Sequence, residues 1–161
     1  MSYPGKMLPD GLSDAPAIAM PARQLLGTVC VAGGAACPLF GRAGEASAIL
    51  ARVKADPAVS IRLTSDADRI PHYTALDAAD FARLDREGLY NRKRDLDVLQ
   101  RLGLVPGDTR RARYLYELLL QRVETPCGIC ACDTPQWEGC PLARSGAYEG
   151  VRAKGAASLV Y

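Results

Sequence analysis

The chain has 161 residues, of which 48% are hydrophobic and 24% charged, and its formal net charge is +2. This length suits a single domain with a real hydrophobic core. The near-neutral charge excludes a general affinity for nucleic acid or for anionic membranes. No apolar run reaches the roughly 18 residues that a membrane-spanning helix requires, so we expect no membrane span.

The N-terminal segment, residues 1–22, holds four prolines and two glycines. This composition predicts an extended arm ahead of a domain over residues 23–161. Acidic residues and prolines interrupt the apolar stretch of the segment, which is not typical of a signal peptide, and we therefore expect a cytoplasmic protein. The arm and the C-terminal tail, residues 155–161, are candidate docking segments.

The first half of the domain alternates helical and extended patterns. Residues 24–41 are rich in small side chains and are expected to begin as a short helix or strand and then form a loop. Residues 45–56 predict a helix whose inner face carries Ile49, Leu50 and Val53. Residues 58–64 alternate apolar and polar side chains, which predicts a half-buried strand.

The second half is predicted to be helical. Residues 74–88 indicate a helix with a capping box at its start and Gly88 as its C-terminal cap. Residues 92–123 indicate a helix, a turn at residues 104–108 and a second helix whose N-terminal cap is Asp108 or Thr109. The expected fold class is therefore a small, mainly helical α+β domain with a cysteine-bound metal centre near the C-terminus.

The chemistry of the chain is concentrated in its cysteines. Two lie at positions 30 and 37, and the other four lie between residues 127 and 140: Cys127, Cys130, Cys132 and Cys140. A close pair combined with distant cysteines is a common way to hold a metal, because a Cys-x-x-Cys spacing turns two thiolates toward one centre. Cytoplasmic cysteines stay reduced, so metal binding or catalysis is favoured over disulfides.

Several occupants fit such a set. A [4Fe–4S] cluster uses four thiolates, and the last ligand in ferredoxins is typically followed by proline, as are Cys37 and Cys140. Zinc would use the same ligands, but structural zinc sites usually show two tight pairs, and Cys30 and Cys37 form a loose one. The spacing therefore favours the cluster, with zinc as the alternative. A redox-active Cys-x-x-Cys pair and cysteines packed as small hydrophobes remain less favoured.

A series of short motifs runs through the second half of the chain. They are Asp95, Val98-Leu99, Leu102-Gly103-Leu104, Pro106-Gly107-Asp108, Arg122-Val123, Cys127-Gly128, Cys130 and Cys140. In this order they resemble the C-terminal half of the DUF1284 family, small proteins regarded as iron–sulfur binders. Residues 23–26, 48–53 and 60–70 resemble its N-terminal half more weakly. The resemblance covers about 120 residues and implies a cluster, but no catalytic activity.

The resemblance leaves the fourth ligand open. The family has a His-Leu-Leu-Cys motif, whose histidine and cysteine are replaced here by Gln24 and Gly27. We favour Cys37 as the replacement ligand, because it is followed by proline and has small neighbours, beside Cys127, Cys130 and Cys140. Cys30 and Cys132 are the alternatives.

Three other features carry weaker signals. His72, the only histidine, is an alternative ligand. A histidine in such a position after proline is, however, more often a surface or capping residue. Trp137 could shield a cluster from water or anchor the core. Arg110, Arg111 and Arg113 could begin a DNA-recognition helix, which would suit a cluster-dependent regulator, although the near-neutral overall charge argues against nucleic acid as a partner.

No catalytic set of residues stands out apart from the cysteines. We therefore expect an electron carrier or accessory subunit that works with a protein partner or within a redox enzyme complex. Independent catalysis is not expected.

Overall fold

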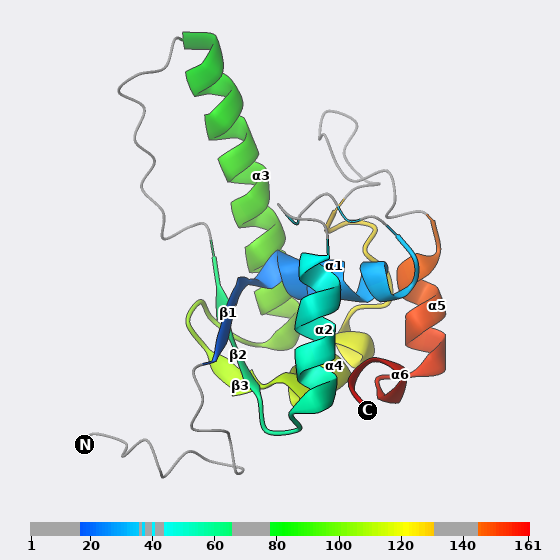
Figure 1. Ribbon diagram of the computed structural model, residues 1–161. Coiled ribbons are helices and arrows are strands. Elements are labelled where there is room, and N and C mark those ends of the chain that lie inside the picture. The colour runs from blue at the N-terminus through cyan, green and yellow to red at the C-terminus, as the bar shows by residue number, and fades with distance from the viewer. Residues whose placement is uncertain (1–16, 36, 38–39, 41–43, 66–77, 131–144) are drawn as a thin grey trace, which may run out of the picture.

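The computed structural model describes residues 17–35, 37, 40, 44–65, 78–130 and 145–161, and within 78–89 only the backbone. Six helices and three strands make up these segments, and they confirm a small, mainly helical α+β fold (Figure 1). In chain order the elements are β1 (Ile18–Pro21), α1 (Ala22–Ala32), α2 (Glu45–Ala55), β2 (Ser60–Thr64), α3 (Ala78–Leu102), β3 (Thr109–Arg111), α4 (Ala112–Arg122), α5 (Ala147–Lys154) and α6 (Ala157–Val160).

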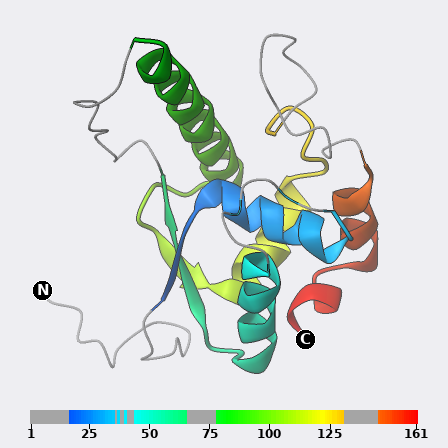
Figure 2. The same cartoon turned by 45° about the horizontal axis from the view of Figure 1, so that its top comes forward.

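The three strands form one sheet in the order β1-β2-β3, with β1 parallel and β3 antiparallel to β2. Residues paired across neighbouring strands share a face, so Met20 and Leu63 lie on one side and Ala19 and Arg62 on the other. The first pair is buried and the second is exposed. The helices lie on the buried side of the sheet (Figure 2).

The predicted strand and the helix before it are confirmed. Val59, Ile61 and Leu63 are at most 1% exposed, as their alternation predicts. The helix predicted over residues 45–56 is α2, and its Leu50 and Val53 are buried. Burial of alternate strand residues against helical stripes is what gives this small domain its core.

Helix α1 lies at the centre of the molecule. It packs against α2, α3 and α5, and Leu25, Leu26 and Val29 are fully buried. Its N-terminus is held by Asp95 of α3, whose carboxylate accepts hydrogen bonds from the backbone N–H and the guanidinium of Arg23. Asp95 belongs to the motifs that resemble the DUF1284 family.

Helix α3 corrects one prediction. Gly88, expected to end a helix, lies inside a single helix of 25 residues. Glycine tolerates a helix interior at a cost of about 1 kcal/mol relative to alanine, so its presence alone does not stop a helix. The N-terminal half of α3 extends away from the other elements (Figure 1). The proposed capping box before it lies outside the described residues.

The segment between α3 and α4 corrects a second prediction. Thr109, Arg110 and Arg111 form strand β3 rather than the cap and first turn of a helix, and α4 begins at Ala112. Across residues 98–122 a strand therefore separates the two helices, which is not the short-turn arrangement of a DNA-binding helix-turn-helix.

Both ends of the described chain are more ordered than the composition suggests. The arm predicted over residues 1–22 does not include residues 18–22, because residues 18–21 form β1 and Ala22 begins α1. The tail predicted as a docking segment contains α6, whose Leu159 and Val160 are buried. None of the helices in the described part of the chain combines the length and the apolarity of a membrane span.

Candidate metal centre

The Cys127–Cys130 segment forms a tight turn directly after α4. The backbone N–H groups of Ile129 and Cys130 both donate to the carbonyl of Pro126, over 3.1 and 2.9 Å. Gly128, which follows Cys127, has a φ of 85°. This conformation costs glycine little free energy and costs other residues more. Glycine at position 128 therefore lets the backbone turn sharply between the two cysteines.

The four described cysteines are in two oxidation states. Cys127 is disulfide-bonded, whereas Cys30, Cys37 and Cys130 carry thiols, so none of these three is its partner. A disulfide sulfur is not a thiolate and cannot act as an ordinary metal ligand. Cys127 therefore fits a metal only after its disulfide has been reduced.

Tyr148 of α5 connects Cys30 with the end of α4. Its hydroxyl donates to the carbonyl of Val123 over 2.7 Å, four residues before Cys127. Burial raises the pKa of Tyr148, and the charge of a Cys30 thiolate adds to the rise. Tyr148 therefore bonds to the end of α4 and lies within electrostatic range of Cys30 in the last turn of α1.

The loop after α1 is held close to the body of the protein at two points. A Cβ at Gly33 would lie 2.2 Å from the carbonyl oxygen of Ala147, so only glycine allows α1 and α5 to approach this closely. Cys37 in this loop lies back against α1. A Cβ at Gly27 would lie only 2.8 Å from its sulfur. The C-terminal end of α1 and the turn after α4 lie on the side of α5 (Figures 1 and 2).

These contacts bring parts of the predicted ligand set to one side of the core without forming a complete site. Within residues that the structure describes, no three His, Cys, Asp or Glu side chains are placed to hold one metal ion. Cys130 is 6% exposed, and Cys30 and Cys37 are half-buried. The predicted ligands Cys132 and Cys140, together with His72 and Trp137, lie outside the described residues.

Two residues at this site were not singled out by the sequence. Tyr148 gave no signal, because a lone tyrosine in a polar segment reveals nothing about its neighbours. Gly27 was noted only as a departure from the family motif. A glycine inside an otherwise helical run often marks a close approach, and that signal could have indicated that another group lies over α1 at this point.

Comparison with known protein families, with curated proteins and with solved structures finds no match to this chain.

Proposed function

We propose that the reduced chain binds a thiolate-coordinated metal centre, a [4Fe–4S] cluster, and carries electrons within a larger assembly. The ligands in this proposal are Cys37, Cys127, Cys130 and Cys140, with Cys30 and Cys132 as alternatives. A bound cluster would supply one-electron redox chemistry. The chain itself would hold the cluster between α1 and the segment after α4.

The position of Cys37 over Gly27 is the observation that carries the proposal. Where the DUF1284 motif has a cysteine, this chain has Gly27, and the sulfur of Cys37 lies 2.8 Å from where the Cβ of residue 27 would be. A thiol from the loop thus occupies the space beside α1 that a cysteine at position 27 would fill. This compensation supports Cys37 as the fourth ligand.

The turn after α4 supplies the second line of support. The carbonyl of Pro126 accepts hydrogen bonds from two backbone N–H groups, and Gly128 has a positive φ. The backbone is therefore already folded sharply between Cys127 and Cys130. Metal binding by these residues requires reduction of the Cys127 disulfide by a dithiol, which forms its own disulfide in exchange. The proposal therefore places the working protein in a reducing compartment such as the cytoplasm.

The first test is anaerobic purification with and without a thiol reductant, followed by a visible spectrum and by iron, sulfide and zinc analysis of the same sample. We expect about four irons and four sulfides per chain in the reduced sample and little metal in the other. Stoichiometric zinc with no colour would replace the proposal by a zinc-stabilised interaction module. Reduced protein with neither metal would overturn both.

Single serine substitutions then identify the ligands. We expect C37S, C127S, C130S and C140S to lose the cluster, whereas C30S and C132S retain it. Retention by C37S together with loss by C30S would move the fourth ligand to α1.

A further inference from the structure

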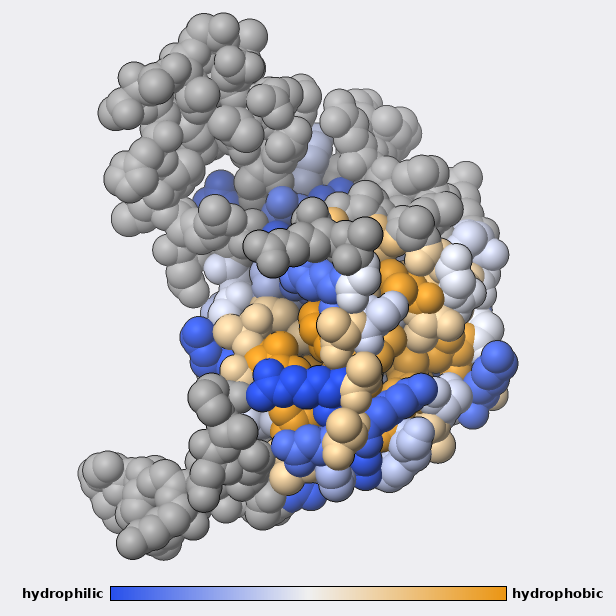
Figure 3. All heavy atoms as spheres, viewed as in Figure 1, coloured by the Kyte–Doolittle hydropathy of each residue, from blue (hydrophilic) through white to orange (hydrophobic). Residues whose placement is uncertain are grey.

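A groove lies between β1 and α2, next to the start of α1. Its volume is about 310 Å³, at the lower end of the range for small-molecule sites. Eight residues line it: Ile18, Ala19, Met20, Gln24, Glu45, Ala48, Ile49 and Arg52. Apolar side chains form an open patch over this part of the surface (Figure 3), and none of the lining residues takes part in the proposed metal site.

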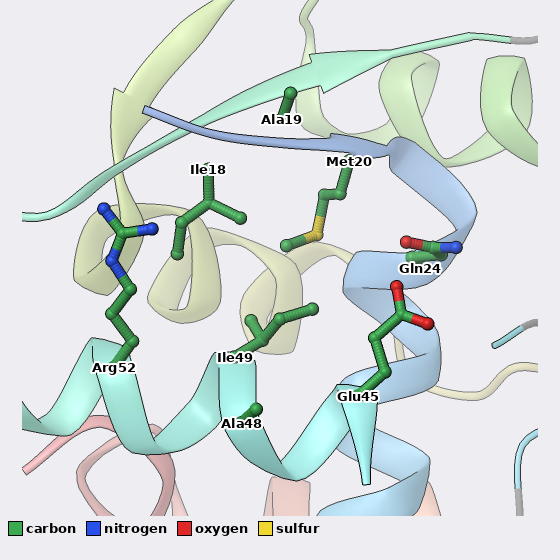
Figure 4. Close-up of a pocket in the computed structure, with 8 residues that line it drawn as sticks. All are labelled: Ile18, Ala19, Met20, Gln24, Glu45, Ala48, Ile49 and Arg52. Atoms are coloured by element: carbon green, nitrogen blue, oxygen red, sulfur yellow. The ribbon is translucent and has the colours of Figure 1, made fainter. Parts of the chain in front are cut away.

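The floor of the groove is apolar. Ile18 and Met20 point down from β1 toward α2, and Ile49 points up from α2 between them (Figure 4). Met20 is 1% exposed, whereas Ile18 and Ile49 are only partly buried. An aliphatic chain placed along the groove would cover these two side chains and remove apolar surface from water.

The two ends of the groove carry opposite charges. Arg52 rises from α2 beside Ile18 at one end, and Glu45 rises from the same helix toward Gln24 at the other (Figure 4). The two residues are seven positions apart on α2, which corresponds to about 10.5 Å along a helix axis. A guanidinium suits a carboxylate, and the carboxylate of Glu45 with the amide of Gln24 suits an ammonium group.

From this geometry we infer that the groove binds a small zwitterion in which an aliphatic chain separates a carboxylate from an ammonium group. The carboxylate lies against Arg52, the chain against Ile18 and Ile49, and the ammonium against Glu45. Arg52 and Gln24 also interact with other groups of the protein, and the ligand shares or replaces these interactions. Binding is therefore expected in the millimolar to high-micromolar range.

An NMR titration of the full chain with ω-aminocaprylate tests the inference by amide chemical shifts. This probe is long enough to reach both charged ends, whereas ω-aminocaproate is shorter and caprylate lacks the ammonium group. We expect saturable shifts at residues 18–20 and 45–52 with ω-aminocaprylate, and weaker binding of both comparison compounds. Absence of saturable shifts, or equal binding of caprylate, would overturn the zwitterion site.

Variants of α2 separate the charges from general effects. Arg52→Met should weaken the binding of ω-aminocaprylate by roughly tenfold or more. Glu45→Gln should weaken the binding of ω-aminocaprylate but leave the affinity for caprylate unchanged. Lys54→Met removes the same charge from an exposed position on the same helix outside the groove, and should bind as the wild type does. Ala48→Leu should block the groove. Equal affinities of Arg52→Met and Lys54→Met would contradict the inference, and none of these outcomes depends on the metal.

Discussion

The carboxylate of Asp95 is completely buried and accepts hydrogen bonds from two groups of Arg23. It lies 2.9 Å from the backbone nitrogen of Arg23 and 2.8 Å from its Nη1 atom. The first contact satisfies an N–H at the start of α1, which has no partner within the helix. The second neutralises a guanidinium whose side chain is only 10% exposed. Removing one member of such a pair leaves the other charge buried without its partner.

Asp95→Asn should therefore lower the free energy of unfolding by about 3–5 kcal/mol. Asp97→Asn on the same helix is the matched control, because its ion pair with Lys93 is much more exposed and should be worth less than about 1 kcal/mol. Urea unfolding of both variants measures the difference. Equal losses would show that the Arg23–Asp95 pair contributes no more than a surface pair.

Gly27 tests the packing of the Cys37 loop. In Gly27→Ala the added Cβ would lie 2.8 Å from the Cys37 sulfur and 2.9 Å from the Phe40 ring. Gly150→Ala in α5 is the control, because nothing lies within 4 Å of its added Cβ. Both variants gain helix propensity, so we expect Gly27→Ala to be less stable than Gly150→Ala by about 1–3 kcal/mol.

The reactivity of Cys37 gives a second readout of the same contact. Displacement of the loop in Gly27→Ala should speed alkylation of the Cys37 thiol, whereas Gly150→Ala should leave the rate unchanged. Mass spectrometry of the alkylated peptide assigns the site. An unchanged rate in Gly27→Ala would mean that the sulfur does not depend on the glycine for its position.

Two tyrosine hydroxyls join the helices to one another. Thr28 of α1 donates to the carbonyl of Leu25, so the hydroxyl of Tyr116 in α4 donates to Thr28 over 2.7 Å. Tyr148 joins α5 to the last carbonyls of α4. Burial raises the pKa of Tyr116, and the hydrogen bond to Thr28 offsets only part of this rise. Burial likewise raises the pKa of Tyr148.

These shifts predict a loss of stability at high pH. An unfolded tyrosine titrates near a pKa of about 10, whereas the folded protein keeps both protons to higher pH. Above about pH 10 the native state binds more protons than the unfolded state, so the free energy of unfolding falls as pH rises further. Each tyrosine contributes a slope of up to about 1.4 kcal/mol per pH unit.

Tyr116→Phe and Tyr148→Phe should each remove part of this slope. At neutral pH each should also cost about 0.5–1.5 kcal/mol through the lost hydrogen bond. Tyr114→Phe, at a position that is 50% exposed, should change neither quantity. Urea unfolding at several pH values between neutral and strongly alkaline measures both effects. A slope unaffected by the two buried substitutions would exclude these tyrosines as its source.

The elements show which patterns a sequence reveals. The second helix predicted within residues 92–123 is α4, apart from its first turn, and its Leu115, Leu118 and Leu119 are buried, because a long periodic pattern leaves few alternatives. Strand β3 was missed because three residues, two of them arginines, carry no alternation. Strand β1 was missed because Pro21 within it and Pro16 before it indicate a loop, although an edge strand tolerates a proline.

The candidate site was only partly readable for a similar reason. The sequence shows that two residues separate Cys127 from Cys130 and that one of them is the glycine Gly128. It does not show that Cys127 is oxidised, because the partner of a sulfur depends on tertiary contacts. Nor does it show that the Cys37 sulfur lies over Gly27, since a loop between two helices can take many paths.

At the scale of the whole molecule, the C-terminal residues complete the core. Helix α6 packs against α2, α4 and α5, with Leu159 at 2% exposure and Val160 fully buried. Leu159→Ala should lower the free energy of unfolding by about 2–5 kcal/mol. Ser158→Ala, at an exposed position in the same helix, should cost much less in the same unfolding measurement. A small effect of Leu159→Ala would restore the prediction of a tail that only docks on partners.

The central position of α1 has a consequence for synthesis. Its partners lie on α2, α3, α4 and α5, so the helix leaves the ribosome long before most of the surfaces that cover Leu25, Leu26 and Val29. Local contacts alone cannot bury this apolar stripe, and a nascent chain exposes it until residues as far as Tyr148 have emerged. Chaperones that recognise exposed apolar helices therefore have a defined target in the newly made protein.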